Sequence, residues 1–84
     1  GAWMSIVYGF AGLRIKEEGL LFSPGIPDAW NAYRFRIRYR DSLMQIDIDK
    51  SAARFTLLSG TAKKLRVYGK THTLADSLEI PLRN

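Results

Sequence analysis

The sequence predicts an all-β fold: a small antiparallel β-sandwich, jelly-roll-like, of about eight strands, preceded by a short apolar helix. Three observations lead to this prediction. Short segments rich in β-branched and aromatic residues follow one another at near-regular spacing. Turn-forming Gly, Pro, Asp and Ser residues separate them. No helical pattern lies between them, and a small closed barrel is the alternative that has the same spacing.

The turn signals set the limits of the expected strands. Pro24 and Pro27 interrupt regular structure after the second strand, because proline has no backbone N–H to donate to a ladder. For the same reason Pro81 makes the last strand an edge or an end. The expected strands are residues 13–16, 20–23, 33–40, 43–49, 53–59, 64–68, 71–74 and 78–82.

The first eight residues are almost uniformly apolar, with Ser5 as the one polar side chain among them. A helix of this kind has no solvent face, so we expect residues 3–8 to be buried against another body, with Gly9 as a left-handed C-terminal cap. A strand over the same residues satisfies the periodicity equally well. Eight residues are too few for an independent helix. We therefore interpret the segment as the stump of a helical body that lies outside this chain.

The clearest strand alternation is a hairpin built around a two-residue turn at residues 41–42. This turn sets a register in which Arg36 faces Asp47 and Arg34 faces Asp49, while apolar residues face apolar residues. A one-residue slip would set apolar residues against charged ones along the whole hairpin. A two-residue slip keeps the parity but loses the Arg36–Asp47 pair.

Four arginines alternate along the first strand of this hairpin, at positions 34, 36, 38 and 40. The stripe either binds phosphate or is the solvated side of a sheet. Phosphate-tracking faces interleave basic with exposed aromatic residues, whereas the aromatic residues here alternate onto the opposite side. We therefore expect a mixed-charge solvated face and no nucleic-acid partner, with Arg38 and Arg40 left unpaired. A basic nucleic-acid-binding β module is the weaker alternative.

Composition narrows the classes of protein further. The 84 residues are 46% hydrophobic and carry a net charge of +5, which is typical of one globular domain. The absence of cysteine excludes disulfides, a thiol nucleophile and a zinc–thiolate site, and it fits a reducing compartment, so we expect a cytoplasmic protein. No apolar run is long enough to span a bilayer, and we expect no membrane partner.

Candidates for catalysis are few. His72 is the only histidine, and a turn at residues 69–70 would place it opposite Val67 as a structural residue. Glu17 and Glu18 are adjacent in a turn, where their carboxylates point apart instead of facing each other across a sugar. No cluster of His, Asp and Glu has the spacing of metal ligands. We therefore expect no catalytic residue, no metal site and no cofactor.

Trp30 and Tyr33 are the candidates for contact with a carbohydrate, because aromatic rings can form a stacking platform for a sugar. Packing in the core, or cover for the loop at residues 24–27, is the commoner role for such a pair. A carbohydrate-binding module that uses Trp30 and nearby aromatic residues is the alternative function.

Residues 1–14, Gly-Ala-Trp-Met-Ser-Ile-Val-Tyr-Gly-Phe-Ala-Gly-Leu-Arg, resemble a junction near the C-terminus of glycoside hydrolase family 65. This family comprises the maltose, trehalose and kojibiose phosphorylases. Its Gly-x-Trp-x-x-x-Val-x-Gly-Phe-x-Gly-x-Arg run closes a helical catalytic barrel and enters a small β domain. The positions that match are Gly1, Trp3, Val7, Gly9, Phe10, Gly12 and Arg14. Later stretches are also similar, namely residues 19–24, 26–27, Trp30, 59–60 and the closing Leu-x-Ile-Pro-Leu run.

The resemblance implies a division of the chain. Residues 1–12 would be the end of the last barrel helix and the junction, and residues 13–84 the C-terminal β-sandwich. The parent would be an inverting phosphorylase of α-linked glucose disaccharides that yields β-glucose 1-phosphate. The family's general acid and phosphate-binding residues lie in the barrel, and no position here matches them. We therefore expect a non-catalytic accessory domain.

The resemblance also implies a partner, namely the missing catalytic barrel of the same chain. The expected residues of this domain interface are apolar and lie before the first strand: Trp3, Ile6, Val7 and Phe10. In the absence of the barrel, the same apolar segment is the expected site of self-association.

Overall fold

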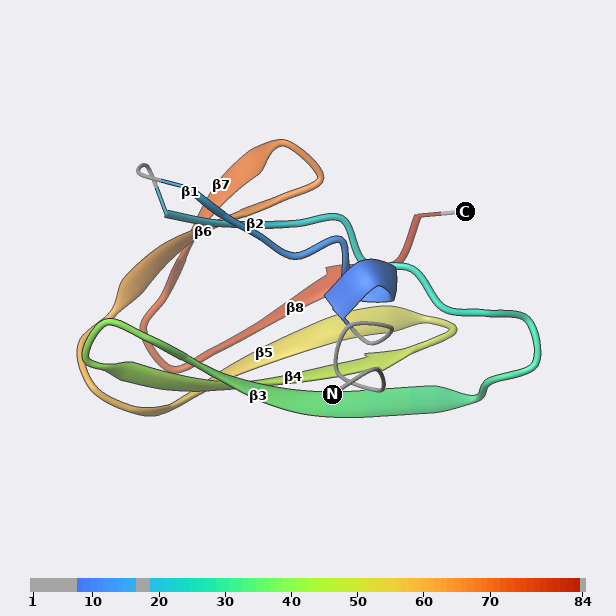
Figure 1. Cartoon of the computed structure of the whole chain (residues 1–84), viewed down its shortest axis with the longest axis horizontal. Helices are drawn as coiled ribbons and strands as arrows, with labels where there is room; N and C mark the ends of the chain where they lie inside the picture. Colours follow the sequence, from blue (N-terminus) through green and yellow to red (C-terminus); the bar gives the residue numbers. More distant parts are fainter. Residues whose placement is uncertain (1–7, 17–18, 84) are drawn as a thin grey trace.

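The structure is a computed structural model that describes residues 8–16 and 19–83. In this part of the chain, one helical turn at residues 8–11 precedes eight strands (Figure 1). The strands are β1 (Arg14–Lys16), β2 (Gly19–Phe22), β3 (Ala32–Tyr39), β4 (Ser42–Asp49), β5 (Ala52–Ser59), β6 (Lys63–Val67), β7 (Lys70–Leu74) and β8 (Ser77–Pro81). The predicted all-β sandwich of about eight strands is therefore confirmed. None of the described helical residues forms a helix long and apolar enough to cross a membrane.

The strands form two four-stranded sheets that lie face to face (Figure 1). Sheet A has the order β1-β2-β6-β7, and sheet B has the order β3-β4-β5-β8. Neighbouring strands are antiparallel except β2 and β6, which pair in parallel with Leu20 opposite Leu65. The parallel pair arises because the chain leaves sheet A after β2, builds most of sheet B and returns to sheet A as β6. As expected, the strand that contains Pro81 is an edge.

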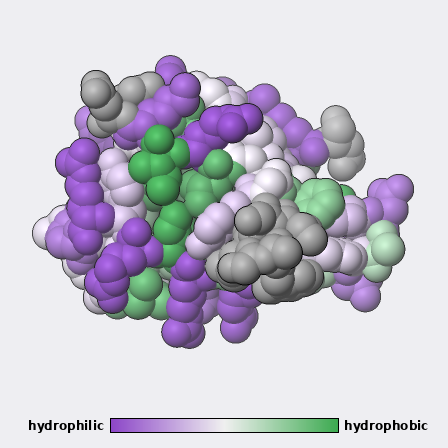
Figure 2. Space-filling model, in the orientation of Figure 1, coloured by the Kyte–Doolittle hydropathy of each residue, from purple (hydrophilic) through white to green (hydrophobic). Residues whose placement is uncertain are grey.

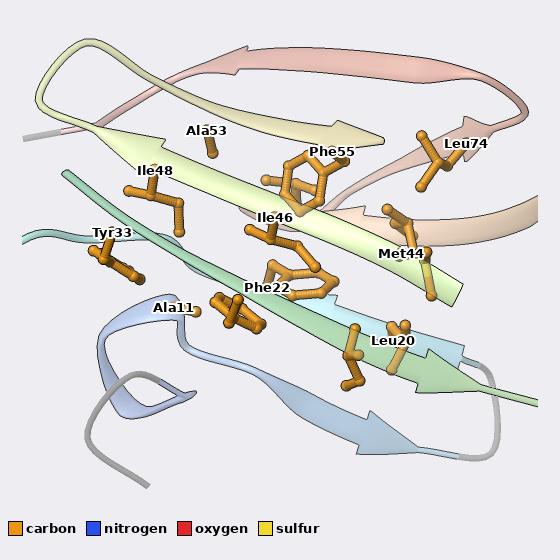
Figure 3. Packing of buried hydrophobic residues seen from close by; sticks show 14 residues of the cluster. Ala11, Leu20, Phe22, Tyr33, Met44, Ile46, Ile48, Ala53, Phe55 and Leu74 are labelled. Atoms are coloured by element: carbon orange, nitrogen blue, oxygen red, sulfur yellow. The ribbon is translucent and has the colours of Figure 1, made fainter. Parts of the chain in front are cut away.

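The core lies between the two sheets. Because side chains alternate along a strand, every second residue points into this space. Figure 3 shows Phe22 of sheet A and Ile46 and Phe55 of sheet B pointing into this space. The rings of Phe22 and Phe55 meet edge to face, with centroids 5.1 Å apart. The buried cluster comprises Ala11, Leu20, Phe22, Tyr33, Phe35, Ile37, Met44, Ile46, Ile48, Ala53, Phe55, Leu65, Val67 and Leu74.

The register of the β3–β4 hairpin differs from the predicted one by two residues. Arg34 lies opposite Asp47 and Arg36 opposite Gln45, so the turn is at residues 40–41 and the prediction of residues 41–42 is wrong. The parity is as predicted, and Tyr33, Phe35 and Ile37 face the core. In sheet B, β3 is an edge strand and β4 lies inside the sheet.

The contacts of the turn explain this shift. Ser42 is fully buried as the first residue of β4, and its hydroxyl donates to the carbonyl of Thr61. The carboxylate of Asp41 accepts from the Thr61 N–H at 3.0 Å and pairs with Lys63 Nζ at 2.6 Å. These contacts tie the turn to the connection between β5 and β6, which lies far away in the sequence. They favour the observed register, in which Arg36 lies opposite Gln45, over the predicted one, in which it would face Asp47.

The helical turn ends in a Schellman motif centred on Gly12. Gly12 has a φ of 62°, its N–H donates to Gly9 O at 3.1 Å, and the N–H of Leu13 donates to Tyr8 O at 3.1 Å. The prediction of Gly9 as the cap is therefore wrong, since Gly9 lies within the helical turn. The rest of the predicted helix, at residues 3–7, lies outside the described residues.

Candidate functional site

Three of the predicted site residues meet in one aromatic cluster, which we define as Phe10, Trp30 and Tyr33. The ring of Trp30 lies between the other two, with centroids 5.5 Å from Phe10 and 5.6 Å from Tyr33. Both contacts are edge to face, so the rings present no common flat surface. The helical turn and β3 therefore converge on Trp30, at the end of the long connection between β2 and β3.

Tyr33 belongs to the interior of this cluster. Its side chain is only 8% exposed, and its hydroxyl donates to Gly25 O at 2.6 Å. Burial raises the pKa of the Tyr33 phenol far above its usual range, and Tyr68 adds to this effect. Little of the Tyr33 ring is accessible for stacking on a sugar. The more accessible members of the cluster are Phe10, which is 39% exposed, and Trp30, which is half-buried.

The connection between β2 and β3 is held in place by backbone hydrogen bonds to the helical turn. The N–H of Ser23 donates to Ala11 O at 3.0 Å, and the N–H of Gly25 donates to Phe10 O at 2.8 Å. On its other side, the hydroxyl of Tyr68 donates to Pro24 O. This segment is therefore anchored by the helical turn and by the β6–β7 turn of sheet A, and it leads to Trp30, which lies against Phe10.

The arginine stripe of β3 is largely occupied by contacts within sheet B. Arg34 forms a salt bridge with Asp47, and Arg36 Nε donates to Gln45 Oε1 at 3.1 Å. Arg40 lies over the ring of Tyr39, 5.2 Å from its centroid. As predicted, neither Arg38 nor Arg40 has an ion pair with a described carboxylate. The face is a mixed-charge surface, although the pairs differ from those predicted.

Asp49 pairs with Arg54 instead of with Arg34. Its carboxylate accepts from Arg54 at 2.8 Å and from the N–H groups of Ser51 and Ala52 at 2.7 and 2.9 Å. The hydrogen bond from Arg54, followed by those two N–H groups, lowers the pKa of Asp49 to about 2. A carboxyl group with this pKa stays ionised near neutral pH and cannot act as a general acid. Its contacts close the turn between β4 and β5.

A shallow hollow of about 530 Å³ adjoins these ion pairs on the outer side of sheet B. Its charged residues are Arg34, Asp47, Asp49 and Arg54. Both aspartates project from one face of one strand, and each is neutralised by a guanidinium. A pair of carboxylates facing each other across a bound sugar is therefore not present at this hollow.

His72 is half-buried on β7 and faces Leu65. The prediction that it faces Val67 is wrong, because the turn is at Tyr68 and Gly69, whose φ angles of 51° and 80° fit a type I′ hairpin. Within the described ranges, no group of three or more His, Cys, Asp or Glu side chains could hold a metal ion.

Comparison with known proteins gives the family. Residues 13–74 match the model of the glycosyl hydrolase family 65 C-terminal domain. The chain belongs to this family. An α,α-trehalose phosphorylase from Geobacillus stearothermophilus is 45% identical over 86 residues, which cover 100% of this chain and 11% of that protein. A maltose phosphorylase from Bacillus subtilis (strain 168) is 40% identical over 68 residues, 81% of this chain and 9% of that protein.

A solved structure assigned as a kojibiose phosphorylase from the human microbiome has the same fold. It superposes with a TM-score of 0.89 at 38% identity, over 99% of this chain and 12% of that one. The family 65 chain described here therefore spans about a tenth of the length of the relatives it matches. The region that it matches is the C-terminal domain of the family.

The surface of this family 65 domain has two further features that the sequence did not indicate. Apolar side chains gather in a strip with hydrophilic neighbours on the face seen in Figure 2. The most exposed large apolar residue described is Ile15 on β1, at 62%. In addition, cations of two strands, β1 and β6, lie on the outer face of sheet A on either side of β2, and they have no ion pair with a described carboxylate. Strand pairing from different parts of the chain makes this face, so no single stretch of sequence reveals it.

Proposed function

We propose that this chain is a non-catalytic accessory or scaffold domain of a disaccharide phosphorylase, or of a related glycoside hydrolase, that acts on α-glucosides. One observation carries the proposal: the chain matches a C-terminal domain and only 11% of the length of a trehalose phosphorylase. The proposed parent is an inverting phosphorylase of the cytoplasm. The absence of cysteine supports that compartment.

The use of the carboxylates supports a structural role. Asp41, Asp47, Asp49 and Glu79 each pair with a lysine or an arginine of the described chain. A general acid needs a carboxyl group whose pKa lies near the working pH, and such a pKa usually results from burial without a cationic partner. These four groups have the opposite surroundings, since each has a cation within ion-pair distance.

We further propose that residues 1–12 are the junction and that residues 13–84 are the domain itself. The left-handed Gly12 and the family match that begins at residue 13 support this boundary. The partner is the catalytic barrel, and Phe10 is a candidate for the interface because it is exposed beside Trp30. Trp3, Ile6 and Val7 belong to the same proposal but lie outside the described residues.

The test is phosphorolysis by the purified 84-residue chain. Trehalose, maltose and kojibiose are each incubated with inorganic phosphate, and glucose 1-phosphate is measured. The expected result is no release above the buffer blank, with the intact Geobacillus stearothermophilus trehalose phosphorylase as the positive control. Release by the chain alone would overturn the proposal.

A second measurement addresses the sugar-binding alternative. Tryptophan fluorescence is recorded while maltose or trehalose is added to the chain. Because Tyr33 is buried and the rings of the aromatic cluster are not coplanar, we expect no saturable change. A saturable change that Trp30→Ala abolishes would favour a carbohydrate-binding module.

A further inference from the structure

The outer face of sheet A carries four exposed cations: Arg14, Lys16, Lys64 and Arg66. They belong to two strands, β1 and β6, that flank β2. On β6, both cations alternate with the buried Leu65 and Val67, so they point away from the core.

The register arranges these side chains in two rows across the sheet. Arg14 lies opposite Leu21, which lies opposite Arg66. Lys16 lies opposite Gly19, and the position of a Cβ at Gly19 would be 3.3 Å from Lys64 O. Since neighbouring strands are about 4.8 Å apart, the cations on β1 and β6 lie on the order of 10 Å from each other across β2.

Between the cations of β1 and those of β6, β2 forms a low floor. Gly19 has no side chain, and Leu21 is half-buried. A hollow of about 320 Å³ extends from this floor toward β7 and is lined by Leu20, Leu21, Lys64, Leu65, Arg66 and Thr71. The hollow itself is lined by β2, β6 and β7, and the register places the cations of β1 on the other side of β2. We call the strip along β2 between the cations of β1 and β6, together with this hollow, the β2 groove.

The charge of the β2 groove is not balanced within the described residues. No salt bridge joins any of its four cations to a described carboxylate, whereas Arg34 and Arg54 of sheet B are both paired. Glu17 and Glu18 of the β1–β2 connection lie outside the described residues. Among the described residues, the four cations of the groove therefore have no carboxylate partner, whereas Asp47, Asp49 and Glu79 offset part of the positive charge on the outer face of sheet B.

We propose that the β2 groove is a docking surface for an acidic segment of the rest of the polypeptide. This inference rests on the proposed function, because it names the part of the domain that contacts the larger protein. The floor favours a protein partner: an apolar centre with a charged rim is typical of protein interfaces. Single-stranded nucleic acid would require exposed aromatic rings, and the lining of the hollow contains none.

The first experiment uses the isolated chain and polyglutamate as a soluble acidic polypeptide. Binding is expected to weaken as salt is added, because the groove is exposed and salt screens its charges. The double variant Lys64→Glu/Arg66→Glu should weaken binding about tenfold or more. The matched control, Arg36→Glu/Arg38→Glu, makes the same charge change on sheet B and should change the affinity less than about twofold.

All four of these positions are exposed, so both variants are expected to fold, and circular dichroism checks this. Equal losses in both variants, or no loss in either, would overturn the docking surface. Tighter binding of a labelled single-stranded DNA, lost in the sheet A variant alone, would overturn it in favour of a nucleic-acid surface.

The second experiment locates the partner. In the Geobacillus stearothermophilus trehalose phosphorylase, the matching region is replaced by this chain, and lysine acetylation is mapped by mass spectrometry. Lys16 and Lys64 should react about tenfold more slowly in the chimera than in the isolated chain. Lys50 and Lys70, which are exposed elsewhere, serve as internal controls and should react equally in both.

The two proposals fail in different ways in this chimera. An active chimera with unprotected Lys16 and Lys64 would overturn the docking surface and leave the accessory role standing. Protected lysines together with phosphorolysis by the isolated chain would overturn the accessory role and leave the docking surface standing.

Discussion

Ser42 is the residue that fixes the start of β4. It is fully buried, and its hydroxyl donates to Thr61 O, so it connects the β3–β4 hairpin with the β5–β6 connection. Beside it, Asp41 binds Thr61 and Lys63 through its carboxylate. Two adjacent side chains thus hold together segments about 20 residues apart in the sequence. Local geometry at single residues decides how the strands of sheet B are aligned.

Ser42→Ala should lower the free energy of unfolding by about 1 kcal/mol, the usual contribution of one hydrogen bond. The matched control is Ser77→Ala, because Ser77 is exposed on β8 and should give a change below about 0.5 kcal/mol. Urea unfolding of both variants measures the difference. Equal effects would contradict the assignment of Ser42 to a buried strand position.

Gly12→Ala should lower the free energy of unfolding by about 2–4 kcal/mol. The new side chain would have to adopt a φ of 62°, and its Cβ would lie 2.8 Å from Ser23 O. Gly69→Ala is the control, since Gly69 has a φ of 80° and open space around it, and it should cost about 1 kcal/mol. Similar values for the two variants in urea unfolding would rule out the close approach of Gly12 to Ser23.

Acid should destabilise the protein through Asp49. Its folded pKa of about 2 lies below the unfolded value of about 3.9, so its contribution is present above the unfolded value and is lost as the pH falls through about 2. Asp49→Asn removes this titration while its amide oxygen can still accept from Ser51 and Ala52. Between about pH 4 and pH 2, the range between these two pKa values, the melting temperature of Asp49→Asn should therefore fall less than that of the parent chain. Parallel profiles for the variant and the parent would contradict this account.

At the scale of the elements, the eight strands were predictable because each has a clear alternation and ends at a turn residue. Their alignment was less predictable. The hairpin parity followed from Tyr33, Phe35 and Ile37, since these residues require the core side. The choice between two registers of equal parity depended on the contacts of Asp41 and Ser42 with the β5–β6 connection, which sequence patterns do not contain.

The cap of the helical turn likewise depends on contacts that the sequence pattern does not contain. The predicted burial concerned residues 3–8, most of which lie outside the described residues. The cap is Gly12 and not Gly9, because Gly12 has the left-handed φ of 62° and a Cβ there would meet Ser23. The hydrogen bonds of Phe10 and Ala11 to the β2–β3 connection make the junction part of the fold. The junction before residue 13 is therefore not a linker that can be removed freely.

A chain that begins at residue 13 should keep the sandwich but lose about 2–3 kcal/mol of stability. The reason is the loss of buried Ala11, of the Tyr8–Phe35 ring contact and of the hydrogen bonds to Ser23 and Gly25. Urea unfolding followed by Trp30 fluorescence measures the change. A truncated chain as stable as the full one would show that the junction contributes nothing to the domain.

At the scale of the whole molecule, charge and core are arranged differently on the two sheets. Sheet B pairs Arg34 with Asp47, and Arg54 with Asp49 and Glu79, whereas the outer cations of sheet A, Arg14, Lys16, Lys64 and Arg66, have no ion pair with a described carboxylate. The arginine stripe was the obvious basic feature of the sequence, and in the structure Arg34 is its member with an ion pair, to Asp47. The β2 groove could not be predicted, because its two sides come from strands about 50 residues apart.

The family followed from the first fourteen residues and is shown by the comparison, while the role of the domain is the claim that needs an experiment. The most direct one is the trehalose phosphorylase chimera in which this chain replaces the matching region, with the release of glucose 1-phosphate from trehalose as the measurement. The proposed accessory role predicts an active chimera, because the relative supplies the catalytic body and this chain would supply only its support. A folded chimera without activity, beside an active intact relative, would contradict it.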